Sequence, residues 1–192
     1  MSVRIVLGAQ WGDEGKAKIV DYLTADSDVV VRYQGGANAG HTIKAGDLKF
    51  VFHLIPAGIV HSDKTCVVGN GVVLDPDALF EEVEDLESKG ISVEGRLFVS
   101  PNTHLVMPYH KVLEQASEEK IGDAAIGTTL RGIGPTYQDK INRSTGIRVG
   151  DLLDPEILPS KIRANLREKN EILQKIYGQE GLDEVPMIEQ YM

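Results

Sequence analysis

The sequence predicts a three-layer α/β fold around a mostly parallel sheet. The chain opens with an apolar run at 3–7, a glycine-rich segment at 8–15 and helical spacing at 16–23. That strand–loop–helix order begins many α/β folds that bind nucleotides. Several further short apolar runs follow, with helical segments between them. We expect residues 3–7 to be the central strand of the sheet.

The remaining elements follow from apolar runs and the residues that punctuate them. Asp75 and Pro76 suit the cap and first position of a helix that runs to about Lys89, and Gly90 suits its end. Strands are expected at 28–33, 49–55, 65–68 and 96–99.

Helix and loop dominate the predictions for the later part of the chain. Residues 105–119 have partial helical spacing that is broken at Pro108, and residues 158–177 form an amphipathic helix. Residues 122–150 are expected to be a long loop. Because no closing element is recognisable at the end of the chain, we interpret the sheet as incomplete. The alternative is a compact natural domain.

Composition and charge exclude several classes of protein. The 192 residues are 42% hydrophobic and 26% charged, as in an ordinary globular domain. The net charge of −9 argues against binding nucleic acid or an anionic membrane surface. The one cysteine, Cys66, excludes an internal disulfide framework and is expected to pack in the core. No run approaches 18 apolar residues and no signal peptide is recognisable, so the sequence predicts a cytoplasmic protein without a membrane span.

The first candidate site is the glycine-rich segment that leads into the first helix. Free backbone N–H groups at a helix N-terminus attract phosphate, and Lys16 adds a point charge. Gln10 and Ala17 depart from a Walker A loop, which has glycine and a hydroxyl residue at those positions. Asp13 is unusual in a phosphate loop. It either binds Mg²⁺ beside the phosphates or caps the helix.

Two further segments carry candidate chemistry. Residues 34–42 combine small residues, which let the backbone approach a ligand, with His41 at the edge of the loop. Residues 127–143 contain hydroxyls, glycines and basic side chains, and are interpreted as an anion-binding loop. The competing interpretations are a structural histidine and an exposed basic surface loop.

Together these three segments resemble the adenylosuccinate synthetase family. The sequence QWGDEGK at 10–16 is similar to the family's first signature, and GIGP-x-Y-x-x-K-x-x-R at 132–143 is similar to its second. The segments at 34–42 and 69–74 agree as well. The resemblance implies a P-loop-NTPase-like sheet, of which residues 1–192 would be the N-terminal part of a single GTP- and IMP-binding domain, with the C-terminal half missing.

The resemblance also implies an activity. Members of the family make adenylosuccinate from inosine monophosphate (IMP), L-aspartate and GTP with Mg²⁺, the first committed step from IMP to AMP. Asp13 would be the general base on IMP and a metal ligand, His41 the acid that assists phosphoryl transfer, and Lys140 a further catalytic residue. The second Mg²⁺ ligand would be the Gly40 carbonyl. Arg143 would reach the site of a neighbouring subunit, which implies a homodimer.

Binding residues are implied in the same way. The residues expected to contact GTP are Gly12, Asp13, Glu14, Gly15, Lys16, Ala17, Lys18, Gly40 and Thr42. The residues expected to contact IMP are Asn38, Ala39, His41, Thr129 and Arg143.

Two departures from the family pattern leave alternatives open. Ala17 stands where the first signature has glycine, which is harmless only if the residue is helical. The chain is also much shorter than family members and has no N-K-x-D guanine motif. It is therefore expected to be inactive in isolation. A non-catalytic nucleotide-binding fragment, a ligase acting on a related purine nucleotide and a generic P-loop GTPase are the other interpretations.

Overall fold

The computed structural model describes residues 2–10, 15–45, 48–142 and 144–192, and confirms the α/β class. The strands are β1 (Val29–Gly35), β2 (His41–Ala45), β3 (Leu48–Phe52), β4 (Thr65–Leu74), β5 (Leu97–Val99) and β6 (His104–Leu105). The α-helices are α1 (Lys16–Thr24), α2 (Pro76–Ser88), α3 (Pro108–Ile121), α4 (Ile133–Ile141), α5 (Ile157–Ile172) and α6 (Glu184–Tyr191).

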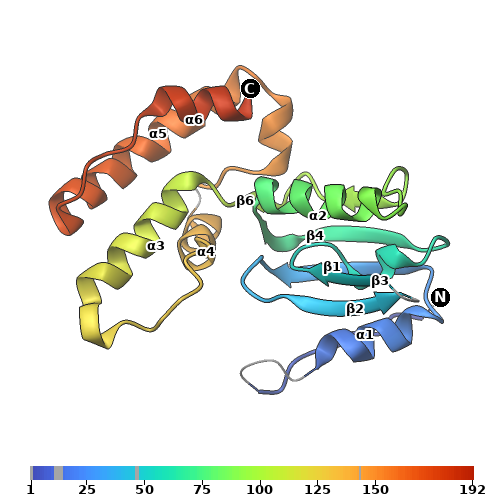
Figure 1. The fold of residues 1–192 in the computed structure, drawn as a ribbon. Coiled ribbons are helices and arrows are strands. Elements are labelled where there is room, and N and C mark those ends of the chain that lie inside the picture. The colour runs from blue at the N-terminus through green and yellow to red at the C-terminus, as the bar shows by residue number, and fades with distance from the viewer. Residues whose placement is uncertain (1, 11–14, 46–47, 143) are drawn as a thin grey trace.

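The main sheet is parallel and has the order β1-β4-β5, with β6 pairing the last two residues of β4. Strands β2 and β3 form a separate antiparallel hairpin. Helices α2 and α1 lie on opposite sides of the strands, which gives three layers (Figure 1). Helices α3 to α6 gather beyond the carboxyl ends of β1 and β4 (Figure 1). In parallel α/β sheets, that end of the strands is where ligands bind.

Helix α2 begins and ends where its sequence predicts. Pro76 takes the first helical position and Gly90 follows the helix with a left-handed φ of +79°. Asp75 occupies the cap position, but its side chain makes no cap bond and instead forms an ion pair with Lys111 at 2.7 Å. On the buried side of α2, the Glu82 carboxylate accepts hydrogen bonds from the backbone N–H groups of residues 53–55 at 2.8–3.2 Å. Glu82 therefore fastens α2 to the segment that follows β3.

The prediction that residues 3–7 form the central strand is wrong. These residues pair with no strand of the described chain, and Val3, Ile5 and Leu7 are 84%, 70% and 69% exposed. Strand β1 lies at one edge of the described sheet, and its Val29 and Val31 are also exposed. An apolar run becomes a central strand only when strands lie on both of its sides, and the described residues supply none next to this run.

Two predictions for the later part of the chain need correction. Residues 122–150 are not one long loop, because α4 lies within them and the 3₁₀ turn Val149–Leu153 begins at their end. The chain also ends in α6, which the sequence did not reveal; Asp183 caps it by accepting from the Val185 N–H. The predicted helix at 158–177 is confirmed as α5, followed by the π-helical turn Leu173–Tyr177.

The core consists of two main clusters, and Leu79 of α2 packs against both. One cluster joins β4 to the helices beyond its end, through residues such as Leu105, Tyr109 and Ile162. The other packs the hairpin against β1, β4 and α2 and contains Cys66, which is fully buried as predicted. Among the described helices, none is long and apolar enough to cross a membrane.

Candidate functional site

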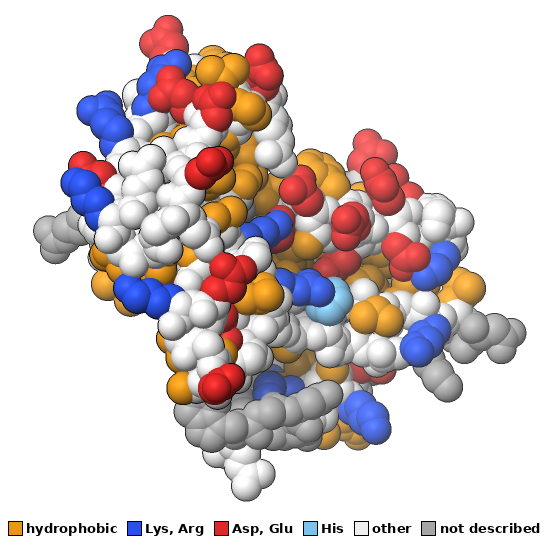
Figure 2. Space-filling model, turned by 60° about the vertical axis from the view of Figure 1, so that its left-hand side comes forward, with side chains coloured by type: hydrophobic (Ala, Val, Ile, Leu, Met, Phe, Trp, Pro, Cys, Tyr) orange, Lys and Arg blue, Asp and Glu red, His pale blue; other side chains and the backbone are white. Residues whose placement is uncertain are grey.

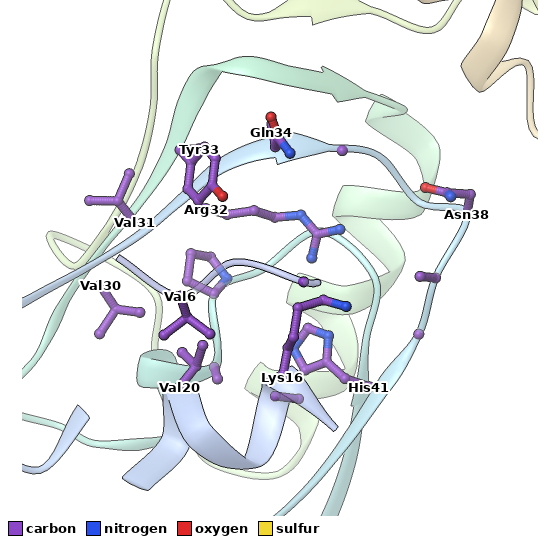
Figure 3. Close-up of a pocket in the computed structure, with 17 residues that line it drawn as sticks. Val6, Lys16, Val20, Val30, Val31, Arg32, Tyr33, Gln34, Asn38 and His41 are labelled. Atoms are coloured by element: carbon purple, nitrogen blue, oxygen red, sulfur yellow. The ribbon is translucent and has the colours of Figure 1, made fainter. Parts of the chain in front are cut away.

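Two cavities contain predicted site residues. The larger cavity lies between the start of α1, the strand β1 and the loop that joins β1 to β2. Its volume is about 730 Å³. The side chains of Lys16 from α1, Arg32 from β1 and His41 from β2 point into the same space, and Asn38 lies at its rim (Figure 3). The cavity therefore collects residues from two of the three segments that the sequence singled out.

Helix α1 presents its N-terminus to this cavity. Gly15 precedes the helix in a left-handed conformation, with φ +80°, and Lys16 and Ala17 are the first two helical residues. The helix end supplies backbone N–H groups and a partial positive charge, to which the Lys16 ammonium adds. Because Ala17 is helical, alanine costs nothing in backbone conformation where the family has glycine.

The loop between β1 and β2 forms the opposite wall. Gly40 lies so close to His53 that an added Cβ would stand 2.6 Å from the imidazole Cε1, so a side chain at position 40 would displace His53. His41 is the first residue of β2, and its ring lies 5.9 Å from the ring of the buried Phe52. Contact with a buried aromatic side chain restricts where the imidazole of His41 can stand.

Arg32 is a cavity residue that the sequence analysis missed. Its guanidinium donates a hydrogen bond of 2.8 Å to the Gly36 carbonyl, and this bond helps to hold the loop between β1 and β2 in place. Burial lowers the pKa of Arg32, against the attraction of the Glu82 carboxylate. Arg32 lies inside an apolar strand, where a single basic residue gives no pattern by which to recognise it.

Lys140 lies elsewhere, in a second cavity of about 310 Å³ that also contains His104 and Arg148. The Lys140 ammonium donates to the carbonyls of Asn70 and Val72 and lies 3.5 Å from His104 Nδ1. Burial, Lys140 and Arg148 together lower the pKa of His104 to about 4, so this imidazole is neutral at pH 7. Burial and Arg148 also lower the pKa of Lys140.

This second cavity has the character of an anion site. Its side chains come from β6, α4 and the segment at 148. An isolated bridge between residues 104 and 148 joins β6 to that segment, and Lys140 of α4 reaches His104 directly. Figure 2 shows Lys and Arg side chains beside a histidine in the hollow between the helical part and the strand part of the molecule, with acidic side chains around them. Sequence reasoning missed His104 and Arg148 because only the tertiary fold joins them to Lys140.

A buried ionic network fixes the position of α4. The Asp139 carboxylate accepts from His110 Nε2 at 2.9 Å and from the Lys169 ammonium at 2.7 Å. His110 Nδ1 accepts the Met107 N–H, so the proton of the neutral ring is on Nε2. Burial alone raises the pKa of Asp139, but the hydrogen bonds from His110 and Lys169 outweigh it and hold that pKa below its ordinary value.

The structure places only some of the predicted site residues together. The larger cavity contains Lys16, Ala17, Asn38, Ala39, Gly40 and His41. Five others do not line it: Gly15 precedes α1, Lys18 lies on α1, Thr42 on β2, Thr129 in the exposed segment before α4, and Lys140 in the second cavity. Gly12, Asp13, Glu14 and Arg143 lie outside the described residues, so their predicted roles remain predictions.

Comparison with known sequences gives one family. The family model for adenylosuccinate synthetase matches residues 5–192. The adenylosuccinate synthetase of Salinibacter ruber is 58% identical over 200 residues, which cover 100% of this chain and 45% of that protein. The same enzyme from Chlorobium chlorochromatii is 56% identical over 187 residues, which cover 97% of this chain and 43% of that protein. The chain spans less than half the length of these relatives.

Comparison with solved structures agrees. The fully ligated adenylosuccinate synthetase of Plasmodium falciparum superposes with a TM-score of 0.82 at 37% identity, covering 96% of this chain and 42% of that one. The succinoaminodeoxyadenylate synthetase of cyanophage S-2L, bound to dGMP and to dATP as an energy donor, superposes with a TM-score of 0.57 at 26% identity. That match covers 83% of this chain and 45% of the phage protein.

Proposed function

The chain belongs to the adenylosuccinate synthetase family, and from this membership we propose that it is the N-terminal part of a ligase that forms adenylosuccinate from IMP and L-aspartate with GTP. Because it spans less than half the length of its relatives, the activity is proposed for the longer protein that contains it. In that protein, residues 1–192 supply phosphate-binding and proton-transfer groups of one GTP- and IMP-binding domain.

The observation that carries this proposal is the larger cavity. It brings the N-terminus of α1, with Lys16, opposite Asn38 of the loop between β1 and β2 and His41 at the start of β2. Phosphoryl transfer requires cationic groups and backbone N–H groups around the phosphates, and an acid at the oxygen that leaves with the nucleoside diphosphate assists it. The cavity offers all of these group types within one space.

Each residue then has a distinct role in the proposed reaction. Lys16 and the first N–H groups of α1 hold the GTP phosphates. His41 is the acid that assists transfer of the γ-phosphoryl group to the 6-oxygen of IMP, by donating to the oxygen that leaves with GDP, while Asn38 holds the purine nucleotide. Asp13, which the resemblance makes the general base, removes the N1 proton of IMP. Aspartate afterwards displaces phosphate from 6-phosphoryl-IMP.

The residues near the cavity are compatible with Mg²⁺, which the family uses. Mg²⁺ prefers oxygen ligands and takes several of them from phosphates and water. Gly40 lines the cavity, so its carbonyl can serve as one such ligand, and the Asp13 carboxylate is the proposed second. When bound, the ion neutralises charge on the transferred phosphate. No three acidic, histidine or cysteine residues within the described ranges form a metal site of their own.

The second cavity supports a separate role for Lys140. With His104 neutral, Lys140 and Arg148 supply the positive charge of that cavity. We assign Lys140 to holding an anionic part of a substrate. We further propose that the longer protein forms a homodimer, in which Arg143 reaches the site of the neighbouring subunit. We also propose a cytoplasmic location, in keeping with a single buried thiol.

A second candidate is a ligase that acts on a related purine nucleotide, as the cyanophage protein's name indicates for that enzyme. The greater likeness to the Plasmodium falciparum synthetase favours IMP. The presence of Asp13 in the sequence points the same way, because relatives with other nucleotides tend to lose this aspartate. An assay that offers both IMP and dGMP distinguishes the two candidates.

The test uses a longer protein, in which this chain replaces the matching part of the Salinibacter ruber relative. Adenylosuccinate formation is measured with GTP, IMP, aspartate and Mg²⁺. We expect activity in this fusion, a loss of about 10²-fold or more in His41→Asn and in Asp13→Ala, and nearly unchanged GTP binding in His41→Asn. The matched control is His61→Asn, since His61 lines neither cavity. Near-normal turnover in His41→Asn would refute the assignment.

A further inference from the structure

The strands β1 and β4 pair irregularly just before the glycine loop. The register changes between Arg32 and Gln34, so that Gly69 and Asn70 of β4 lie opposite Tyr33 alone of β1. At this point the two backbones come so close that a Cβ on Gly71 would stand 1.9 Å from the Tyr33 carbonyl oxygen. An irregularity of this kind interrupts the regular ladder of hydrogen bonds between strands.

The hydroxyl of Tyr137, from helix α4, bridges the strands at this irregularity. Its oxygen accepts the Gly35 N–H at 2.8 Å and donates to the Gly71 carbonyl at 2.9 Å, with the Gly35 carbonyl a further 3.3 Å neighbour. One side chain from a distant part of the sequence thus satisfies a backbone donor of β1 and a backbone acceptor of β4. Tyr137 lines neither of the two cavities.

The helix that carries Tyr137 is a firm support. The neighbouring Asp139 is held by the buried His110 and Lys169. At the start of α4, the Gly132 N–H donates to the Glu114 carboxylate at 2.6 Å. Because these bonds tie α4 to α3 and α5, the tyrosine ring cannot shift without breaking contacts on several sides.

The point held by Tyr137 is where the loop between β1 and β2 leaves the sheet. Gly35 is the last residue of β1, and Asn38, Gly40 and His41 follow within six residues. Gly35 has a φ of +87°, so the chain turns sharply there. A displacement at Gly35 therefore moves the whole segment that carries the two side chains at the cavity.

We propose that Tyr137 is a positioning residue: its hydroxyl sets the path of residues 35–41, and through that path places Asn38 and His41 in the cavity. The tyrosine acts on the proposed reaction without touching a substrate. The claim that Tyr137 sets the path of the loop does not depend on the proposed function. The expected effect on turnover does rest on the proposed function.

The first test measures backbone hydrogen exchange in the 192-residue chain. Tyr137→Phe removes the hydroxyl and keeps the ring. We expect exchange at the amide of Gly35 and across 36–41 to rise about tenfold, because the bond that protects Gly35 is lost. Exchange at Val68, in the middle of β4, should stay as it is.

Tyr109→Phe is the matched control. The Tyr109 side chain is fully buried, and its hydroxyl has no hydrogen-bond partner among the described residues. The same chemical change there should leave the exchange of residues 35–41 unaltered. Unchanged exchange at Gly35 in Tyr137→Phe overturns the proposal, and so does an equal rise at Val68 or an equal effect of Tyr109→Phe.

The second test measures kinetics in the longer fusion protein. We expect Tyr137→Phe to lower kcat about tenfold and to raise KM for IMP, because misplacement of catalytic groups by about an ångström is costly. A loss of folded protein would lower kcat and leave KM unchanged, and that result overturns the positioning role. If the unmutated fusion is inactive, the proposed function fails and the exchange experiment still decides the role of Tyr137 in the loop.

Discussion

Replacing Asp139 by asparagine tests the buried network that fixes α4. The Lys169 side chain is 7% exposed, and the nearest carboxylate to its ammonium is that of Asp139, at 2.7 Å. Its other acidic neighbour, Glu168, lies at 3.4 Å and is half-exposed. Asp139→Asn therefore leaves a buried cation without adequate compensation. Removing one partner of a buried pair costs about 3–5 kcal/mol, and we expect that range here.

Removing both charges should cost much less than removing one. In Asp139→Asn/Lys169→Met, the His110 Nε2–H still has an amide oxygen as acceptor, and no cation remains buried. A buried pair replaced by uncharged groups of similar size is often nearly neutral. We expect the double variant to be more stable than Asp139→Asn by about 2 kcal/mol or more.

Urea unfolding of the 192-residue chain measures both effects. With a slope of about 2–3 kcal/mol per molar urea for a chain of this size, Asp139→Asn should lower the midpoint by at least about 1 M. The double variant should recover most of that loss. A double variant as unstable as the sum of its two single variants would show that the pair is not coupled, and would refute the reasoning. The two single variants and the double variant form a complete cycle.

Three further outcomes are expected. Glu82→Gln leaves one of the buried N–H groups at 53–55 without an acceptor, and should lower the free energy of unfolding by about 2–3 kcal/mol in a urea titration. The control is Glu81→Gln on the exposed side of α2, which should change that free energy by less than about 0.5 kcal/mol. The pKa of His104 is lowered in the folded state to about 4 from an ordinary 6.5, so the stability linked to it is complete above pH 6.5 and is lost as the pH falls to 4. The free energy of unfolding should fall from pH 7 to pH 5, and this fall should be about 1 kcal/mol larger in the original chain than in His104→Asn. The difference is no larger because the cavity is open to screening solvent. An equal pH dependence of the two proteins would contradict this. The 192-residue chain alone should form no adenylosuccinate in a steady-state assay, and should bind GTP and ATP with similar affinity by calorimetry, because much of the rate comes from holding both nucleotides in line.

Local sequence signals predicted the elements whose stability is local. Helix α2 has proline at its first position and glycine after its end, and both signals act within the helix itself. Helix α4 was missed because Gly134 and Pro135 are typical of loops. Pro135 lies in the first turn, where its missing N–H costs no hydrogen bond, and Gly132 precedes the helix in a left-handed conformation.

The features that the sequence did not predict depend on contacts between segments that are distant in the sequence. The apolarity of residues 3–7 indicates that burial would be favourable, but it does not provide the adjacent strands that a central position requires. The candidate site was predictable where its members are close in sequence, as with Asn38 and His41 on one loop. Arg32 and His104 could not be recognised, because their roles depend on the strands and bridges that bring distant segments together.

The Cys66 thiol can report when the strands of the main sheet separate. This thiol is the one cysteine of the sequence, lies in β4 between β1 and β5, and is fully buried. Burial raises its pKa to about 11, so at neutral pH it is both shielded and protonated, and alkylating reagents require the thiolate. Alkylation of the folded chain must therefore wait for β4 to separate from its neighbours. The labelling rate at Cys66 measures how often the middle of the sheet opens, without any added probe.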